Sequence, residues 1–330
     1  MARRTAGPRP DRAQLTGIHR ERWFRLGPVE LGVSIPVATD RRLARSRFVR
    51  AVRRSRRSDR RAVVSQAPNS AEPLDARRPE TSDIDPASFP LIDRVARLDW
   101  YHSMDLGHGV TSPGRVDYRG QAASLLPESL TGKRCLDAMT TDGFWAFEME
   151  KRDAAEVVAV DVARASERDM PAQVRSQILE AGADYPTGDA FALACEALGS
   201  RVIRREISVY RLAPEVLGKF DFMFAGDVLL GLRDPQLALD RLHSICAGTL
   251  HVLDTYHTGL ESFGETCLAE YPMWSTDSRV WWYPSANTIR QMLRTGGFGS
   301  VTEVARFMAD IPGASDGSPR RARVLMRASV

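Results

Sequence analysis

The 330-residue chain lacks several features that would assign it to a simple class of protein. Its four cysteines are scattered and show neither a metal-binding spacing nor a disulfide framework, which fits a reducing compartment. No stretch approaches the roughly 18 consecutive apolar residues that a membrane-spanning helix needs. The N-terminus also lacks the apolar core of a secretory signal. We therefore expect a cytoplasmic protein that does not enter a membrane.

Charge is distributed unevenly along the chain. Residues 1–80 carry 20 arginines and 8 acidic residues, a net of +12, whereas the rest of the chain carries a net of −8. The densest basic segment, residues 41–61, could bind nucleic acid or an anionic surface, or could be a solvated extension. We expect residues 1–88 to be an arginine-rich, disordered extension with a linker, and residues 89–330 to form the folded domain.

The stretch 133–162 has the pattern of a βαβ unit. A mostly apolar strand (134–139), a short helix (144–151) and a β-branched strand (156–160) follow one another. In such a unit the strands are parallel and a ligand binds beyond their carboxyl ends. Asp161 ends the second strand, where an acid commonly binds the ribose hydroxyls of a nucleoside.

The glycine-rich turn of a dinucleotide site is largely missing. Where G-x-G-x-x-G would stand, the chain has Met139, Thr141 and Gly143, so a single glycine remains. A pyrophosphate needs close approach to bare backbone N–H groups, which two side chains hinder. The turn therefore favours a nucleoside without phosphates over NAD or FAD. A plain βαβ core unit without a ligand is the alternative.

The rest of the folded region predicts alternating helices and strands. Strands are expected at residues 201–207, 220–225, 249–253, 300–307 and 321–328, and helices at 91–98, at 189–198, after Asp234 and after Ser285. This order predicts an α/β fold with a seven-stranded, mostly parallel sheet, an antiparallel C-terminal hairpin and helices on both faces.

Three segments of the chain resemble a known family. They are TGKRCLDAMTTDGFWAF (131–147), FDFMFAGDVLLGLRDPQLAL (220–239) and WWYPSANTIRQMLRTGGF (281–298). They are similar to class I S-adenosylmethionine-dependent methyltransferases. More narrowly, residues 100–308 resemble the group that modifies the wobble uridine of tRNA, the mo5U34 methyltransferases and carboxymethyltransferases. The resemblance implies the Rossmann-like class I methyltransferase fold and S-adenosylmethionine as cofactor.

The resemblance also implies the residues of a cofactor site. They are Asp137, Met139 and Gly143 at the methionine end, Asp161 at the ribose, Ser208 and Val209 beside the adenine, and Gly226 with Asp227 near the sulfonium. Carboxymethyl-transferring members carry a lysine where this chain has about Asp105. An aspartate at a desolvated contact would repel a carboxylated cofactor, so we expect ordinary S-adenosylmethionine and simple methyl transfer.

Methyl transfer to a hydroxyl needs a general base with a pKa near neutrality. His257, just after the fifth strand, is our first candidate, and a solvated loop histidine is the alternative interpretation. Asp227 could be a base or a cofactor contact, and we favour the contact. Tyr101 and His102 are expected to close over the cofactor from the N-terminal side. Trp282 is expected to stack on the acceptor, or else to pack under a long loop.

The charge of the folded region bears on the acceptor. A tRNA enzyme binds a polyanion and should be basic, whereas this region is acidic. We favour a small-molecule acceptor, such as a secondary metabolite. A tRNA bound through the arginine-rich tail is the alternative, and a catalytically silent nucleic-acid-binding protein is a third hypothesis.

Overall fold

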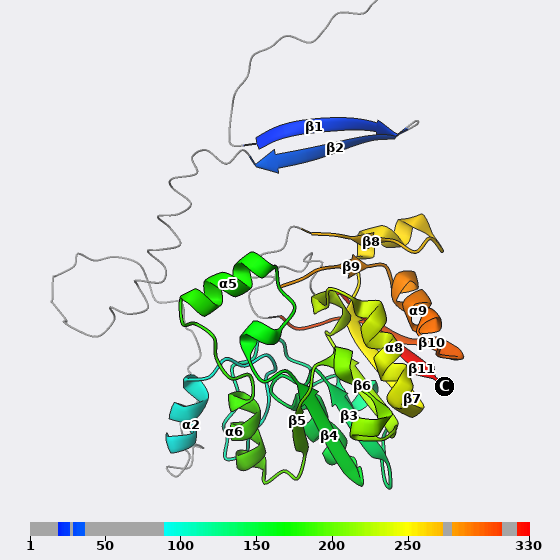
Figure 1. The fold of residues 1–330 in the computed structure, drawn as a ribbon. Helices are drawn as coiled ribbons and strands as arrows, with labels where there is room; N and C mark the ends of the chain where they lie inside the picture. Colours follow the sequence, from blue (N-terminus) through cyan, green and yellow to red (C-terminus); the bar gives the residue numbers. More distant parts are fainter. Residues whose placement is uncertain (1–18, 27–28, 37–88, 273–278, 312–321) are drawn as a thin grey trace, which may run out of the picture. The chain divides into compact units, whose positions relative to one another are not determined.

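A computed structural model describes residues 19–26, 29–36, 89–272, 279–311 and 322–330 (Figure 1). The chain divides into two units, Met1–Arg77 and Arg78–Val330. The described part of the first unit is an antiparallel hairpin of β1 (His19–Leu26) and β2 (Val29–Pro36). We did not predict this hairpin, because charged residues interrupt its apolar pattern. The arginine-rich segment 41–61 lies outside the described residues.

The second unit is built on a seven-stranded sheet in the order β10-β11-β7-β6-β3-β4-β5 (Figure 1). Its strands are β3 (Arg134–Ala138), β4 (Glu156–Asp161), β5 (Ile203–Glu206), β6 (Phe220–Gly226), β7 (Cys246–Thr255), β10 (Ser300–Met308) and β11 (Ala322–Ser329). β11 is antiparallel to both β7 and β10, and the other neighbours are parallel. The predicted α/β fold with its antiparallel C-terminal hairpin is therefore confirmed.

Helices cover both faces of this sheet. The α-helices are α2 (Phe89–Ala96), α3 (Ala122–Leu125), α4 (Phe144–Glu150), α5 (Ala172–Glu180), α6 (Asp189–Leu198), α7 (Pro214–Leu217), α8 (Pro235–Ile245) and α9 (Ala286–Thr295). One apolar cluster joins α2, α4 and α6 to the sheet, and a second joins α8 and α9 to the opposite face. Alternate strand residues supply the two clusters, as with Cys135 and Leu136 in β3. No helix in the described ranges is long and apolar enough to cross a membrane.

The predicted helix ends have the expected capping groups. Asp234 accepts a hydrogen bond from the backbone N of Leu237 (3.0 Å), and Ser285 accepts one from Thr288 (3.2 Å). Strand β7 is longer than predicted because it pairs with β6 on one side and β11 on the other. Its extension carries Asp254 to the same edge of the sheet as the predicted cofactor residues.

Candidate functional site

Four aspartates mark the carboxyl ends of four adjacent parallel strands. Asp161 ends β4, Asp137 lies near the end of β3, Asp227 follows β6, and Asp254 lies near the end of β7. Three of them are at most 4% exposed, and the side chain of Asp227 is 2% exposed. Because these ends meet at one edge of the sheet, the aspartates form an acidic row where α/β folds bind ligands.

Two of these aspartates hold the turn after β3. The hydroxyl of Thr140 and the backbone N of Ala146 donate to Asp137, at 2.6 and 3.2 Å. The backbone N of Thr141, in the turn after β3, donates to Asp161 at the end of the adjacent strand β4, at 3.1 Å. The structure thus brings the predicted methionine-end and ribose residues together.

The turn keeps a left-handed backbone without the glycines that usually supply it. Met139 and Thr141 have φ values of 56° and 55°, and Gly143 has a φ of 93°. A left-handed conformation costs a residue with a side chain roughly 1–2 kcal/mol. The hydroxyl of Thr141 offsets part of that cost by donating to the carbonyl of Met139 at 3.2 Å. The backbone is therefore left-handed at Met139 and Thr141, two positions where the glycine-rich pattern would place glycine.

Burial shifts the ionisation of the acidic row. Burial raises the pKa of Asp137 to about 7, although its hydrogen bond from Thr140 acts in the opposite direction. Burial and then the charge of Asp227 raise the pKa of Asp254 to about 7. Burial also raises the pKa of Asp161, against the charge of Arg168. Crowded, desolvated carboxylates of this kind favour a positively charged ligand.

Asp227 is the centre of a buried network. Its carboxylate accepts hydrogen bonds from the hydroxyls of Tyr101 (3.0 Å) and Tyr118 (2.7 Å), and it pairs with Nε of Arg323 at 2.7 Å. Burial and the charge of Asp227 raise the pKa of both tyrosines well above the usual value, so they remain donors. Since three groups already engage this carboxylate, the geometry does not favour Asp227 as a base, and its contact with the cofactor stays a prediction.

His102 and Asp142 form a second buried pair beside this network. Nδ1 of His102 lies 2.6 Å from Oδ1 of Asp142, and Oδ2 of Asp142 accepts the backbone N–H groups of Tyr101 and His102. The imidazole stacks on Phe144, with ring centroids 5.1 Å apart. The predicted N-terminal residues Tyr101 and His102 therefore lie against the strand-end cluster.

Ser208 and Val209, the predicted adenine contacts, follow β5. This strand lies beside β4, where Glu206 pairs in register with Asp161. Ser208 accepts a hydrogen bond from the backbone N of Tyr210 at 3.4 Å, and Val209 is buried. Both residues thus lie beyond the sheet edge that carries the acidic row.

His257 and Trp282 lie in the long connection that follows β7. Nε2 of His257 pairs with Glu270 at 3.1 Å, and Nε1 of Trp282 donates to the carbonyl of Leu232 at 3.1 Å. The ring of Trp282 also lies 5.0 Å from that of Tyr271. Within the described residues, neither His257 nor Trp282 forms a hydrogen bond or ion pair with the acidic row.

Several residues of the cluster were not predicted. Asp254 follows an apolar strand as Asp161 does, so the same signal was present in the sequence. Tyr118 and Arg323 gave no local signal, because they meet across 205 positions of sequence. Asp105 is exposed, so the desolvated repulsion that we expected from it does not apply in this structure. No group of three or more His, Cys, Asp or Glu residues in the described part could hold a metal ion.

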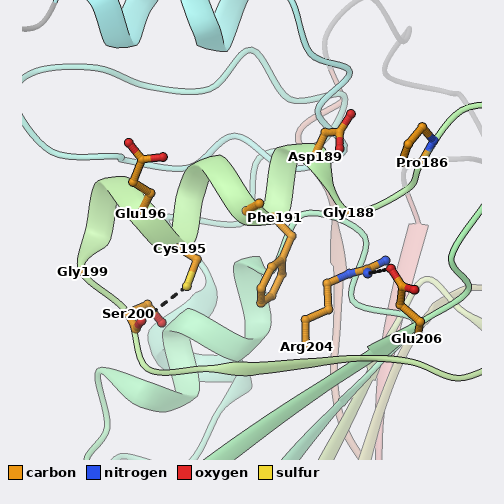
Figure 2. A pocket seen from close by; sticks show the side chains of 11 residues that line it. Pro186, Gly188, Asp189, Phe191, Cys195, Glu196, Gly199, Ser200, Arg204 and Glu206 are labelled. Atoms are coloured by element: carbon orange, nitrogen blue, oxygen red, sulfur yellow. Dashed lines mark hydrogen bonds and ion pairs between the residues drawn. The ribbon is translucent and has the colours of Figure 1, made fainter.

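A separate groove of about 840 Å³ lies between α6 and β5. Figure 2 shows Arg204 paired with Glu206 on one side of this groove, whereas Asp189 and Glu196 lie on α6 and point away from that guanidinium. None of its lining residues comes from the turn after β3 or from the end of β6. We therefore place the candidate site at the acidic row rather than in this groove.

Comparisons with known proteins bear on the family and the fold of the chain. The model of a family described as a methyltransferase domain matches residues 115–303. The N-terminal domain of EvdMO1, solved with S-adenosylhomocysteine and D-fucose, has 13% sequence identity to this chain and a TM-score of 0.51. The match covers 76% of this chain and 99% of that domain. A Burkholderia thailandensis 1,6-didemethyltoxoflavin-N1-methyltransferase is 17% identical with a TM-score of 0.43, over 64% of this chain and 76% of that one. A search of curated proteins gives no match.

Proposed function

The chain belongs to the methyltransferase domain family and uses S-adenosylmethionine as methyl donor, and from this premise we propose that it methylates a hydroxyl of a small molecule. S-adenosylmethionine supplies a methyl group on a sulfonium, and a neutral thioether departs as the leaving group. The protein then has to align the acceptor and exclude water, and proximity alone can contribute roughly 7–11 kcal/mol.

The residues at the sheet edge fit this cofactor. The left-handed turn at Met139 and Gly143 would face the methionine end, together with Asp137. Asp161 would bind the ribose hydroxyls. Ser208 and Val209 would flank the adenine, and Gly226 with Asp227 would form the floor near the sulfonium. Tyr101 and His102 would cover the site, and Trp282 would contact the acceptor.

The acidic row is the observation that carries the small-molecule assignment. Two unit charges 4 Å apart interact by about 4 kcal/mol at an effective dielectric constant of 20. At neutral pH Asp137 and Asp254, with pKa values of about 7, are ionised only in part, and Arg323 offsets the charge of Asp227. The negative charge that remains in the row attracts a sulfonium and repels the phosphates of a polyanion. The net charge of −8 over residues 81–330 acts in the same direction. A tRNA held by residues 41–61 is the alternative.

Transfer of label from tritiated S-adenosylmethionine tests the proposal. The full chain would be offered catechol, caffeate, D-fucose and, separately, bulk unmodified tRNA. D-fucose is included because it was present with EvdMO1. We expect label in a hydroxylated small molecule. Label in tRNA alone would replace the proposal with the wobble-uridine activity, and cofactor binding without any transfer would indicate a silent protein.

A further inference from the structure

We propose that His102, oriented by Asp142, is the general base that accepts the proton of the acceptor's hydroxyl at its Nε2 atom. The proposal rests on the function proposed above. It differs from the sequence-based expectation, in which His257 was the first candidate for this role.

The pair has the geometry of an oriented base. Asp142 lies 2.6 Å from Nδ1 of His102 and therefore favours the tautomer with its proton on Nδ1. Nε2 is then the acceptor atom. This atom is buried and has no hydrogen-bond partner among the described residues. A buried polar atom without a partner is unfavourable, and an acceptor hydroxyl would satisfy it.

A second unpartnered ring nitrogen lies close by. Nε1 of Trp145 is also buried without a hydrogen-bond partner in the described part of the chain, and the two rings are 6.2 Å apart. A Cβ added at Gly226 would lie 2.5 Å from this nitrogen, so Trp145 Nε1 faces the end of β6. Both unpartnered ring nitrogens therefore belong to the same buried aromatic cluster.

The proton balance follows from this arrangement. The O–H bond of the acceptor breaks and its proton forms a bond to Nε2, while the oxygen electron pair forms the bond to the methyl carbon as the thioether departs. The resulting imidazolium is stabilised by Asp142 and later releases the proton to solvent. The base is thus regenerated without any further reactant.

The groups around His102 set the pH at which it can act. Burial alone would lower its pKa, but the charge of Asp142 and the hydrogen bond to it, with the charges of Asp227 and Asp137, raise it overall. The other titratable groups in ring contact with His102 are Tyr101 and Tyr118, which both remain protonated. Transfer to a hydroxyl should therefore increase with pH through the raised pKa of His102.

Two measurements test the role of His102. In ligand-free protein, nitrogen NMR should show the Nδ1-protonated tautomer at high pH. In a transfer assay with the labelled small molecule, His102→Gln should lower kcat by roughly 100-fold or more, as expected for loss of a general base. It should abolish the rising pH limb, and any loss of affinity for S-adenosylhomocysteine should be much smaller than the loss in kcat. Imidazole should restore activity to His102→Ala.

The matched control is His251→Gln. His251 is another buried histidine, with Nδ1 held by the carbonyl of Leu125 at 3.0 Å, and the variant should retain the pH limb. A His102→Gln enzyme with an unchanged pH profile would overturn the proposal, as would loss of that limb in His257→Gln alone. If wild type labels no small molecule, the proposed function fails and the role of His102 fails with it.

Discussion

Replacing Asp161 tests the cofactor site most directly. An ionised carboxylate offers about four lone-pair positions. In the structure one hydrogen bond reaches each oxygen, from the backbone N of Thr141 (3.1 Å) and of Val162 (2.8 Å). Each oxygen therefore retains a position for one ribose hydroxyl. Hydrogen bonds to a charged group are worth about 1.5–3 kcal/mol each, so Asp161→Ala should weaken S-adenosylhomocysteine binding by at least roughly 100-fold.

The same substitution also releases the N–H of Thr141 and could loosen the turn. A double-mutant cycle separates the two effects. Calorimetric titration would compare wild type and Asp161→Ala with S-adenosylhomocysteine and with its analogue lacking both ribose hydroxyls. If Asp161 binds the hydroxyls, the substitution should cost little affinity for the dideoxy ligand. Asp161→Asn keeps one acceptor oxygen and should show an intermediate loss.

Equal losses for the two ligands would refute a direct contact and leave Asp161 as a support of the turn. Unchanged affinity for both would refute the placement of the site at this edge. A circular-dichroism melt of each variant would confirm that the protein remains folded during the titrations.

Three further predictions concern stability in urea. Gly143→Ala should destabilise the protein more than Gly182→Ala. A Cβ at Gly143 would lie 2.5 Å from a ring atom of Phe147, whereas a Cβ at Gly182, which is also left-handed, would meet open space. Equal losses in the two variants would contradict the close packing of Gly143 against Phe147. Arg323→Met should cost about 3–5 kcal/mol because it leaves Asp227 unpaired, and a loss under 1 kcal/mol would show that the pair matters little. The pKa of Asp254 is raised to about 7 in the folded state, so its stabilising contribution is full below its unfolded pKa of about 3.9 and is lost as pH rises through 7. Asp254→Asn should therefore be less destabilising at pH 8 than at pH 5, and equal losses at the two pH values would show that Asp254 does not titrate in this range.

The βαβ unit around Asp161 could be predicted because its signals are local. Apolar strands ending on an acid depend on residues adjacent in sequence, and so do the capping groups Asp234 and Ser285. The conformation of the turn after β3 was predicted less well. Its pattern suggested a degenerate site, whereas the backbone at Met139 and Thr141 adopts the left-handed conformation that glycine would have supplied.

Sequence by itself determined the fold class and the edge of the sheet that carries the acidic row, because hydrophobic periodicity and strand order follow from local burial. Only the tertiary structure decided which polar groups face one another there. The antiparallel insertion of β11 beside β7 brings Arg323 to Asp227, and packing of the N-terminal segment brings His102 to Asp142. Such pairings depend on how distant segments of the chain pack against one another, so they cannot be predicted from a local pattern of residues.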